Sequence, residues 1–264
     1  MTDALKYSLG AGGKRLRPIL TIAVAETIGA EEDSVIDLSC ALEYLHTYSL
    51  IHDDLPAMDN SDLRRGRPTC HRVFGEAVAI LTGDALLTMA FEIVAKYGMQ
   101  EGREKKAIQI IAELASASGV SGMIGGQVLD LEAEGARLSL PEIERIAVMK
   151  TGALIKAAIV CGAIAADATL EQNKALYTYA NKIGPAFQIV DDLLDYESTT
   201  EELGKPAGAD QVRFKATFPA ILGLEEARKK AENLYYQAIT ALEEMNRPAE
   251  LLTGLAKRMV FRTK

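Results

Sequence analysis

Helical periodicity recurs along almost the whole chain, and no stretch shows the two-residue alternation of a half-buried strand. Apolar residues return every three or four positions, which places them on one face of a helix. Several of these helices are apolar on more than one face, as helices inside a bundle are. The pattern predicts an all-α protein with helices over residues 19–28, 35–54, 76–97, 105–123, 141–166, 172–196, 224–245 and 248–262.

These helices are expected to form a single domain over residues 1–264. No linker rich in Gly, Ser or Pro divides the chain, and its length suits one domain with a sizeable core. Pro18 and Pro141 are expected in first helical turns, and Gly29 and Gly98 at helix ends.

Composition excludes several classes of protein. The formal net charge of −8 argues against nucleic acid as a partner, because such proteins need a dominant basic surface. Three cysteines without paired spacing (Cys40, Cys70 and Cys161) predict free thiols in a reducing compartment, and so a cytoplasmic protein. The chain opens without the pattern of a secretory leader. The longest apolar stretch, residues 153–168, contains Lys156 and is shorter than the ~20 residues that cross a bilayer, so no membrane span is expected.

Residues 43–68 combine an apolar helix, an acidic cluster and two arginines. Pro56 should end the helix and turn the chain back, so that a third carboxylate approaches the first two. Each pair of carboxylates at about 4 Å costs roughly 4 kcal/mol at an effective dielectric near 20, so a fold that gathers them should supply cations. Carboxylates favour Mg²⁺ shared with phosphate, and arginines donate to phosphate in pairs. The alternative is a solvated acidic loop; the residues are Asp53, Asp54, Asp59, Arg64 and Arg65.

The same helix carries further candidates upstream of the acidic cluster. His46 and Asp53 are seven residues apart and therefore share a helix face. Ser49 lies on that face one turn before Asp53, and Tyr48 flanks it.

A basic, glycine-rich segment, GAGGKRLRP, occupies residues 10–18. Its glycines can bring backbone N–H groups close to a ligand, and Lys14, Arg15 and Arg17 add positive charge before a helix. A P-loop does not fit, because Arg15 stands where Ser or Thr must follow the lysine. The segment is therefore an anion site or simply a basic turn at a helix start.

A second acidic cluster, FQIVDDLLD, occupies residues 187–195. Asp191 and Asp195 are four residues apart and share a helix face, with Asp192 beside it and Gln188 one turn back. Like charges at this spacing destabilise a helix by a few tenths of a kcal/mol, so the face needs a functional reason.

Weaker signals lie in the middle of the chain. Gln127 and Asp130 follow a pair of glycines, and they either face a polar cavity or are incidental to a kink. Lys150 and Thr151 precede Gly152, where we expect a break in the helix that exposes a carbonyl and a hydroxyl group.

Two basic segments lie toward the end of the chain. Lys205 and Lys215 belong to a glycine-containing loop that suits a flexible cationic lid. The chain closes on Arg262 and Lys264, which are either a frayed tail or part of the same lid.

Together these motifs resemble the trans-isoprenyl diphosphate synthase (polyprenyl synthetase) family, and within it the bacterial farnesyl diphosphate synthases. The resemblance covers nearly the whole chain and rests on GGKRLRP, YSLIHDDLPAMD with DLRRG, GQVLD, MKTG and FQIVDDLLD, at residues 12–18, 48–66, 126–130, 149–152 and 187–195. One DDxxD motif is weak evidence, whereas two in order with basic motifs around them are specific. The resemblance implies the isoprenoid synthase fold, a bundle of about ten helices around a deep central cavity with both aspartate motifs at its mouth.

The resemblance also implies a reaction. Isopentenyl diphosphate would be added to dimethylallyl and then geranyl diphosphate by ionisation, condensation and elimination. About three Mg²⁺, with Mn²⁺ as a substitute, would be bound by Asp53, Asp59 and Asp191, assisted by Asp54, Asp192 and Asp195. The allylic diphosphate would be held by Arg64, Lys150 and Lys205, and isopentenyl diphosphate by Lys14, Arg17, His46 and Arg65. The Lys150 carbonyl, Thr151 and Gln188 would stabilise the allylic cation, under a lid that includes Lys215.

Product length is expected to depend on Tyr48 and Ser49, because a bulky aromatic residue at position 48 accompanies a fifteen-carbon product in the family. Alternatives are a geranylgeranyl diphosphate synthase and a non-catalytic partner subunit, although such subunits tend to lose their aspartates. A terpene cyclase normally mixes Asn, Ser and Glu in its second motif, unlike DDLLD here. The family further implies a homodimer and about one further helix before GGKRLRP. This chain has only residues 1–11 there, so its N-terminal helix is expected to be short or truncated.

Overall fold

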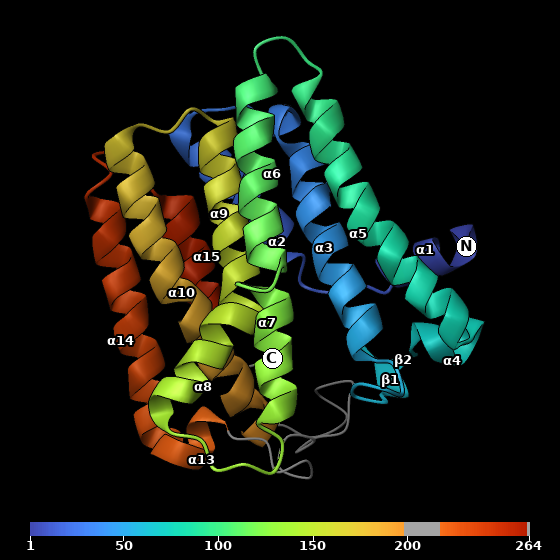
Figure 1. Ribbon diagram of the computed structural model, residues 1–264. Helices are drawn as coiled ribbons and strands as arrows, with labels where there is room; N and C mark the ends of the chain where they lie inside the picture. The colour runs from blue at the N-terminus through green and yellow to red at the C-terminus, as the bar shows by residue number, and fades with distance from the viewer. Residues whose placement is uncertain (198–216, 263–264) are drawn as a thin grey trace.

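The computed structural model describes residues 1–197 and 217–262, and this part of the chain forms a helical bundle with one short hairpin (Figure 1). In chain order the helices are α1 Thr2–Leu9, α2 Leu16–Ile28, α3 Ile36–Asp53, α4 Cys70–Phe74, α5 Glu76–Gly98, α6 Glu104–Ser118, α7 Met123–Glu132, α8 Leu140–Ile146, α9 Ala153–Ala165, α10 Leu170–Glu197, α13 Phe218–Leu222, α14 Leu224–Glu243 and α15 Glu250–Val260. A 3₁₀ turn (η1, Glu32–Ser34), a π-helical segment (η2, Ala147–Gly152) and two strands (β1, Leu63–Arg64, and β2, Arg67–Pro68) complete the described part. The prediction of an all-α protein is confirmed.

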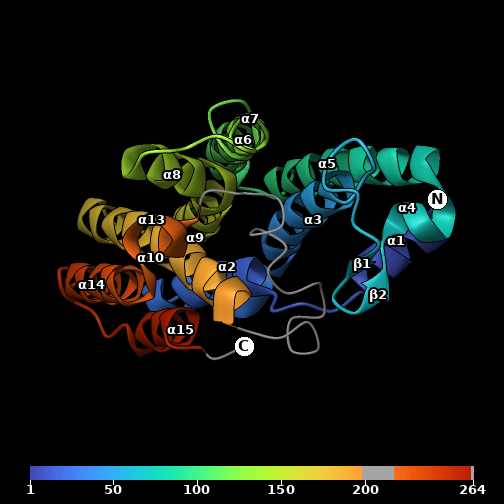
Figure 2. The same cartoon turned by 90° about the horizontal axis from the view of Figure 1, so that it is seen from below.

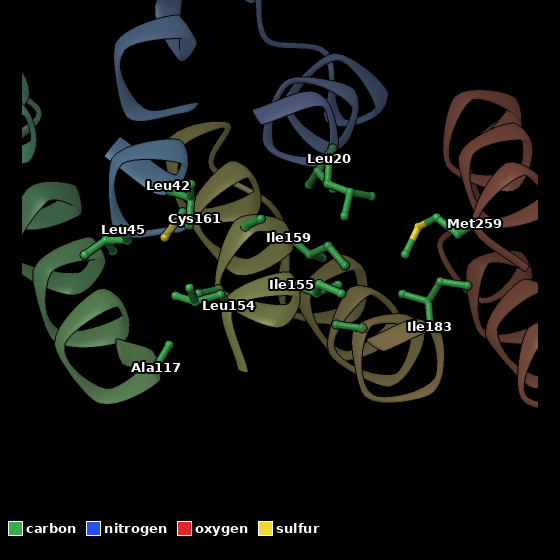
Figure 3. Close-up of a cluster of buried hydrophobic side chains, with 14 of the residues drawn as sticks. Leu20, Leu42, Leu45, Ala117, Leu154, Ile155, Ile159, Cys161, Ile183 and Met259 are labelled. Carbon is green, nitrogen blue, oxygen red and sulfur yellow. The ribbon is translucent and has the colours of Figure 1, made fainter. Parts of the chain in front are cut away.

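Helix α9 forms the centre of the bundle and packs against α2, α3, α6 and α10. Its side chains meet those of the surrounding helices in one apolar core, which Figure 3 shows for Leu20, Leu42, Leu45, Leu154, Ile155, Ile159 and Ile183. Gly162 allows the close approach of α2, because a Cβ there would lie 2.5 Å from the Thr21 carbonyl oxygen. The Thr21 hydroxyl donates to the Ala158 carbonyl at 3.0 Å. The α2–α9 contact therefore fixes the position of α2, the helix that begins at the end of the basic segment.

Helices α3 and α10 end on the same side of the bundle, the lower side in Figure 1, onto which Figure 2 looks directly. Helix α3 ends at Asp53, as predicted from Pro56, and the first acidic cluster follows it. Helix α10 runs through an internal proline, Pro185, and carries the second acidic cluster in its last turns. The fold thus brings both acidic clusters to one end.

Most helix boundaries agree with the signals in the sequence. Pro18 lies in the first turn of α2, and Gly29 ends that helix with a left-handed conformation (φ 109°). Gly98 is the last residue of α5. Pro141 lies in the first turn of α8, where Ser139 and Glu142 form a capping box that satisfies N–H groups at the helix start.

Two local predictions are wrong. Gly152 does not break its helix: it is buried, has helical dihedral angles and lies in the π-helical segment η2, which joins α8 to α9. The hairpin of β1 and β2 was not expected, because its turn is Arg65-Gly66 rather than an Asn-Gly pair. Both turn residues have positive φ (55° and 73°), which matches the geometry of a tight two-residue hairpin turn.

The sequence pattern also overextended one helix and missed short ones. The helix expected over residues 105–123 ends at Ser118, and α7 begins at Met123. Helices α4 and α13, which the pattern does not predict, span five residues each. Helices this short are stabilised by tertiary packing rather than by their own periodicity, which explains why the pattern did not reveal them.

Three helical stretches are long and apolar enough to cross a membrane by length and composition alone, namely Glu76–Gly98, Glu104–Glu132 and Leu140–Ala165. Within the bundle, 33%, 39% and 56% of their most apolar windows are buried, respectively. The third stretch contains α9 and so supplies the centre of the core.

Candidate active site

The first acidic cluster folds back on the end of α3, as the sequence predicted. The Asp59 backbone N–H donates to the Asp53 carbonyl at 2.8 Å, and the Ser61 N–H donates to the Asp54 carbonyl at 3.1 Å. Asp54 is only 3% exposed, and its two carboxylate oxygens accept from Arg64 Nε at 2.8 Å each. Burial raises the pKa of Asp54, and the contact with Arg64 opposes this shift. Asp54 therefore anchors Arg64, while Asp53 and Asp59 border the same turn.

Helix α7 links the first cluster to the π-helical segment. Gln127 donates from its side-chain amide to the Asp53 carboxylate. One helical turn later, Asp130 accepts from Lys150 Nζ at 2.7 Å. The two segments approach closely because Gly126 has no side chain: a Cβ there would collide with the Lys150 backbone. Gln127 and Asp130, whose role the sequence left open, thus connect α3 to η2.

The network continues from η2 into the second acidic cluster. The Thr151 hydroxyl donates to Gln188 Oε1 at 2.5 Å, and Gln188 Nε2 donates to Asp192 at 2.8 Å. Asp192 in turn accepts from the Phe218 backbone N–H at 3.1 Å. A π-helical turn is a frequent feature of functional sites, and here it places Lys150 and Thr151 toward two different helices.

Asp191 and Asp195 differ in exposure although they share a face of α10. The Asp191 side chain is 42% exposed, whereas Asp195 is buried. Asp191 accepts from Arg262, whose guanidinium lies 4.1 Å above the centre of the Phe187 ring. The Arg262 side chain is only 8% exposed. Arg262 of the basic tail therefore packs against the second acidic cluster. Lys264 lies outside the described residues.

A basic cluster lies beside the two acidic ones. Arg17 is buried, which lowers its pKa to about 10, and Glu43 and Asp191 oppose this shift. Burial also lowers the pKa of Lys14, with Arg262 acting in the same sense and Asp191 against it. Asp191 thus acts on both Lys14 and Arg17, so the start of α2 faces the end of α10.

His46 is neutral in this setting. Burial lowers its pKa well below the ordinary value, and the nearby Arg17, Arg65, Arg64 and Arg15 lower it further. A neutral imidazole can donate one hydrogen bond to an anion without adding charge.

Two basic motifs that are far apart in sequence dock on one another. Arg65 donates from its guanidinium to the Gly12 carbonyl, and its side chain occupies the space where a Cβ on Gly13 would be. Gly13 also has a positive φ of 114°, so this position favours glycine on two counts. The glycine-rich segment therefore receives the hairpin arginine.

The predicted chain-length residues lie one to two turns before Asp53. Tyr48 is 4% exposed, and its ring meets the His52 ring edge-on at 5.8 Å. The Tyr48 hydroxyl has no hydrogen-bond partner among the described residues, and burial raises its pKa to about 12. The Ser49 hydroxyl donates to the His46 carbonyl at 2.8 Å. His52 fits against α5 because Gly83 leaves room for its ring.

Lys205 and Lys215, the predicted lid residues, lie outside the described residues. Within residues 1–197 and 217–262, no three carboxylate, histidine or cysteine side chains are close enough to form a preassembled metal site. The chemistry of the donors nevertheless fits Mg²⁺, because Asp53, Asp59 and Asp191 offer hard oxygen ligands. Mg²⁺ is usually held by one or two carboxylates together with water and substrate phosphate.

Comparison with known proteins identifies the family of the chain. The polyprenyl synthetase family profile matches residues 1–252. The chain belongs to the polyprenyl synthetase family. It is 48% identical to farnesyl diphosphate synthase of Escherichia coli, an alignment that covers 100% of this chain and 90% of the relative. It is 47% identical to a chloroplastic geranylgeranyl pyrophosphate synthase of Arabidopsis thaliana, over 89% of this chain and 66% of that one.

A solved structure is similar over nearly the whole chain. Geranyltransferase of Helicobacter pylori, complexed with magnesium and isoprenyl diphosphate, superposes with a TM-score of 0.86 at 34% identity. The match covers 98% of this chain and 86% of the other chain.

The sequence pattern indicates most members of the candidate site, but not all of them. The sequence does not single out Glu43, because a lone glutamate on a helix carries no signal of its own. The sequence does not predict the position of Arg262, because nothing in it says which acidic residue this arginine meets.

Proposed function

We propose that this chain is a farnesyl diphosphate synthase, which adds isopentenyl diphosphate to dimethylallyl diphosphate and then to geranyl diphosphate. One observation carries the proposal: both aspartate clusters lie at the same end of the bundle, joined by hydrogen bonds through α7 and η2 and bordered by a basic cluster. The relatives at 47–48% identity support it, since several of them are farnesyl diphosphate synthases.

The charges and positions of the described residues support the roles proposed for them. Arg64, held by Asp54, and Lys150, held by Asp130, face the allylic diphosphate, with Lys205 from the segment outside the described residues. When bound, Mg²⁺ neutralises the leaving diphosphate and so favours cleavage of the allylic C–O bond. About three ions on Asp53, Asp59 and Asp191 are proposed, as in the family resemblance, with Mn²⁺ as a substitute.

The other substrate is proposed to lie on the basic cluster. Lys14, Arg17, His46 and Arg65 would bind the diphosphate of isopentenyl diphosphate. The isopentenyl double bond attacks the allylic carbon, and the released pyrophosphate takes the proton lost on elimination. Thr151 and Gln188, already hydrogen-bonded to one another, present oxygen dipoles that stabilise the allylic cation without trapping it.

Product length is the finer part of the proposal. A growing chain that descends along α3 from Asp53 reaches Tyr48 after five residues, or about 7.5 Å of helix. The buried ring of Tyr48 is proposed as the floor that stops the product at fifteen carbons, with Ser49 beside it. The alternative, a twenty-carbon geranylgeranyl product, has support from the Arabidopsis relative.

The test is product chromatography after incubation of the purified protein with isopentenyl and dimethylallyl diphosphate, with Mg²⁺ and with EDTA. A Mg²⁺-dependent fifteen-carbon product is expected. A twenty-carbon product would retain the chemistry and overturn the floor, whereas no elongation by folded protein would point to a non-catalytic subunit.

We further propose a cytoplasmic homodimer of a single-domain chain. Large apolar side chains are exposed on neighbouring helices α5, α6 and α7, among them Leu81 (53%), Ile108 (67%) and Val128 (48%). A second copy would cover such a face. The same cover explains why these helices are apolar enough to suggest membrane spans, and we propose that they do not cross a membrane. Cys40, Cys70 and Cys161 are free thiols, which suits a reducing compartment.

A further inference from the structure

A buried carboxylate, Glu43, lies within the basic cluster although no step of the proposed reaction uses it. Glu43 is 6% exposed on α3, and its Oε1 accepts from Arg15 Nη1 at 2.5 Å. Its other oxygen, Oε2, has no hydrogen-bond partner among the described residues. A buried carboxylate with an unsatisfied oxygen is costly to keep, so its presence calls for a reason.

The partner of Glu43 has an unusual backbone conformation. Arg15 precedes α2 with left-handed dihedral angles (φ 47°, ψ 34°), which are uncommon for a residue with a side chain. Its guanidinium is held on one side by Glu43 and on the other by the Leu9 carbonyl. Because Arg15 lies between Lys14 and Arg17, its conformation sets the direction in which both leave the chain. Strain of this kind persists only where surrounding contacts enforce it.

Glu43 also acts on the two arginines that do not touch it. Among the charged neighbours of Arg17 and of Arg65, Glu43 contributes most to keeping each guanidinium protonated against the effect of burial. Arg17 Nε is buried and has no hydrogen-bond partner among the described residues. One carboxylate therefore serves three arginines that would otherwise repel one another.

We propose that Glu43 is a positioning residue for isopentenyl diphosphate: it fixes Arg15 and thereby holds Lys14, Arg17 and Arg65 in the arrangement that binds the diphosphate. This inference rests on the proposed function, because it assigns the basic cluster to that substrate. It gives a role to a buried residue to which the proposed reaction assigns none.

Removal of the Glu43 carboxylate either weakens or tightens diphosphate binding, and this direction distinguishes positioning from simple charge balance. A carboxylate beside a bound diphosphate repels it, so its removal should tighten binding if Glu43 contributed charge alone. If Glu43 positions the arginines, its removal weakens binding despite the relief of that repulsion.

The test uses Glu43→Gln, which keeps the shape and removes the charge, and Glu43→Asp as a second variant that keeps the charge. Glu144→Gln is the matched control, because Glu144 pairs with Lys230 at 2.6 Å on α8 and α14, in a different ion pair. Binding of isopentenyl diphosphate and of inorganic pyrophosphate is measured by calorimetry in EDTA, where no metal contributes. Steady-state KM values for isopentenyl and geranyl diphosphate are measured with Mg²⁺.

For Glu43→Gln we expect the Kd and the KM of isopentenyl diphosphate to rise roughly tenfold or more, the low end for residues that orient a binding group. The KM of geranyl diphosphate and the behaviour of Glu144→Gln should stay within about twofold of the unmodified protein. Arg15→Gln should reproduce the loss, and the double variant should lose no more than either single one, because both act through one contact.

Unchanged or tighter binding by folded Glu43→Gln overturns the inference, as does an equal rise in both KM values. If Glu43→Gln does not fold, the same two comparisons, of diphosphate binding and of the two KM values, are made with Glu43→Asp and Arg15→Gln. Failure of the proposed function is separate: the unmodified protein would then make no prenyl product, while its pyrophosphate binding in EDTA would still report on Glu43.

Discussion

The buried ring of Tyr48 makes a prediction with two independent readouts, product length and stability. Two substitutions separate the ring from its hydroxyl group. Tyr48→Phe removes a buried hydroxyl that has no partner among the described residues, and Tyr48→Ala removes the ring as well. The two variants therefore differ only in the ring that is proposed to stop the growing product.

The expected stabilities follow from the same contacts. An unpartnered buried hydroxyl costs about 1–3 kcal/mol, so Tyr48→Phe should raise the free energy of unfolding by about 1 kcal/mol. Loss of a buried aromatic ring costs about 3–5 kcal/mol. Part of this is the edge-on contact with His52, since aromatic pairs contribute about 0.5–1.5 kcal/mol. Offset by the hydroxyl, Tyr48→Ala should lose a net ~3 kcal/mol.

Urea unfolding measures the stabilities, and chromatography of the products made with Mg²⁺ measures the chain length. Tyr48→Phe should still stop at fifteen carbons, whereas Tyr48→Ala should continue to twenty or more. A folded Tyr48→Ala protein that stops at fifteen carbons would refute the floor. A longer product from Tyr48→Phe would show that the hydroxyl, and not the ring, sets the length.

Three further predictions concern charge and assembly. His46 is kept neutral in the folded protein, whereas in the unfolded protein it takes up a proton below its pKa of about 6.5. Its contribution to the free energy of unfolding is therefore fully present above pH 6.5 and is lost as the pH falls below that value. The urea-derived stability of His46→Gln should therefore fall less between pH 7.5 and 5.5 than that of the unmodified protein, and an equal fall would contradict the prediction. Arg262→Gln removes the partner of Asp191 and should tighten Mg²⁺ binding in the presence of pyrophosphate. The expected gain is up to about fivefold, which corresponds to an ion pair of about 1 kcal/mol. An unchanged Mg²⁺ affinity by calorimetry would contradict this prediction. Leu81→Glu should convert a dimer into a monomer by light scattering, and a variant that remains dimeric would exclude this face as the interface.

The sequence by itself determined the class of fold and indicated most members of the candidate site. Helix α3 ends at Asp53 because Pro56 follows, and the turn that brings Asp59 back is a local consequence of the same residue. Periodicity and proline and glycine signals are properties of neighbouring residues, so they can be read without knowing the rest of the fold. The same local reasoning failed at Gly152, because the helix there is held by packing against α7 and α10.

Only the tertiary structure decided which partner each charged group takes. Asp54 anchors Arg64, Asp130 holds Lys150, and Arg262 lies on Asp191 from 71 positions away. A charge pattern in the sequence is compatible with many such pairings. The choice among them is made by how closely the helices approach, for example where Gly126 lets α7 contact the backbone of η2. For this reason the sequence indicated the aspartates and arginines as a set, but the role of Glu43 among them emerged only from the packing of α3 against the start of α2.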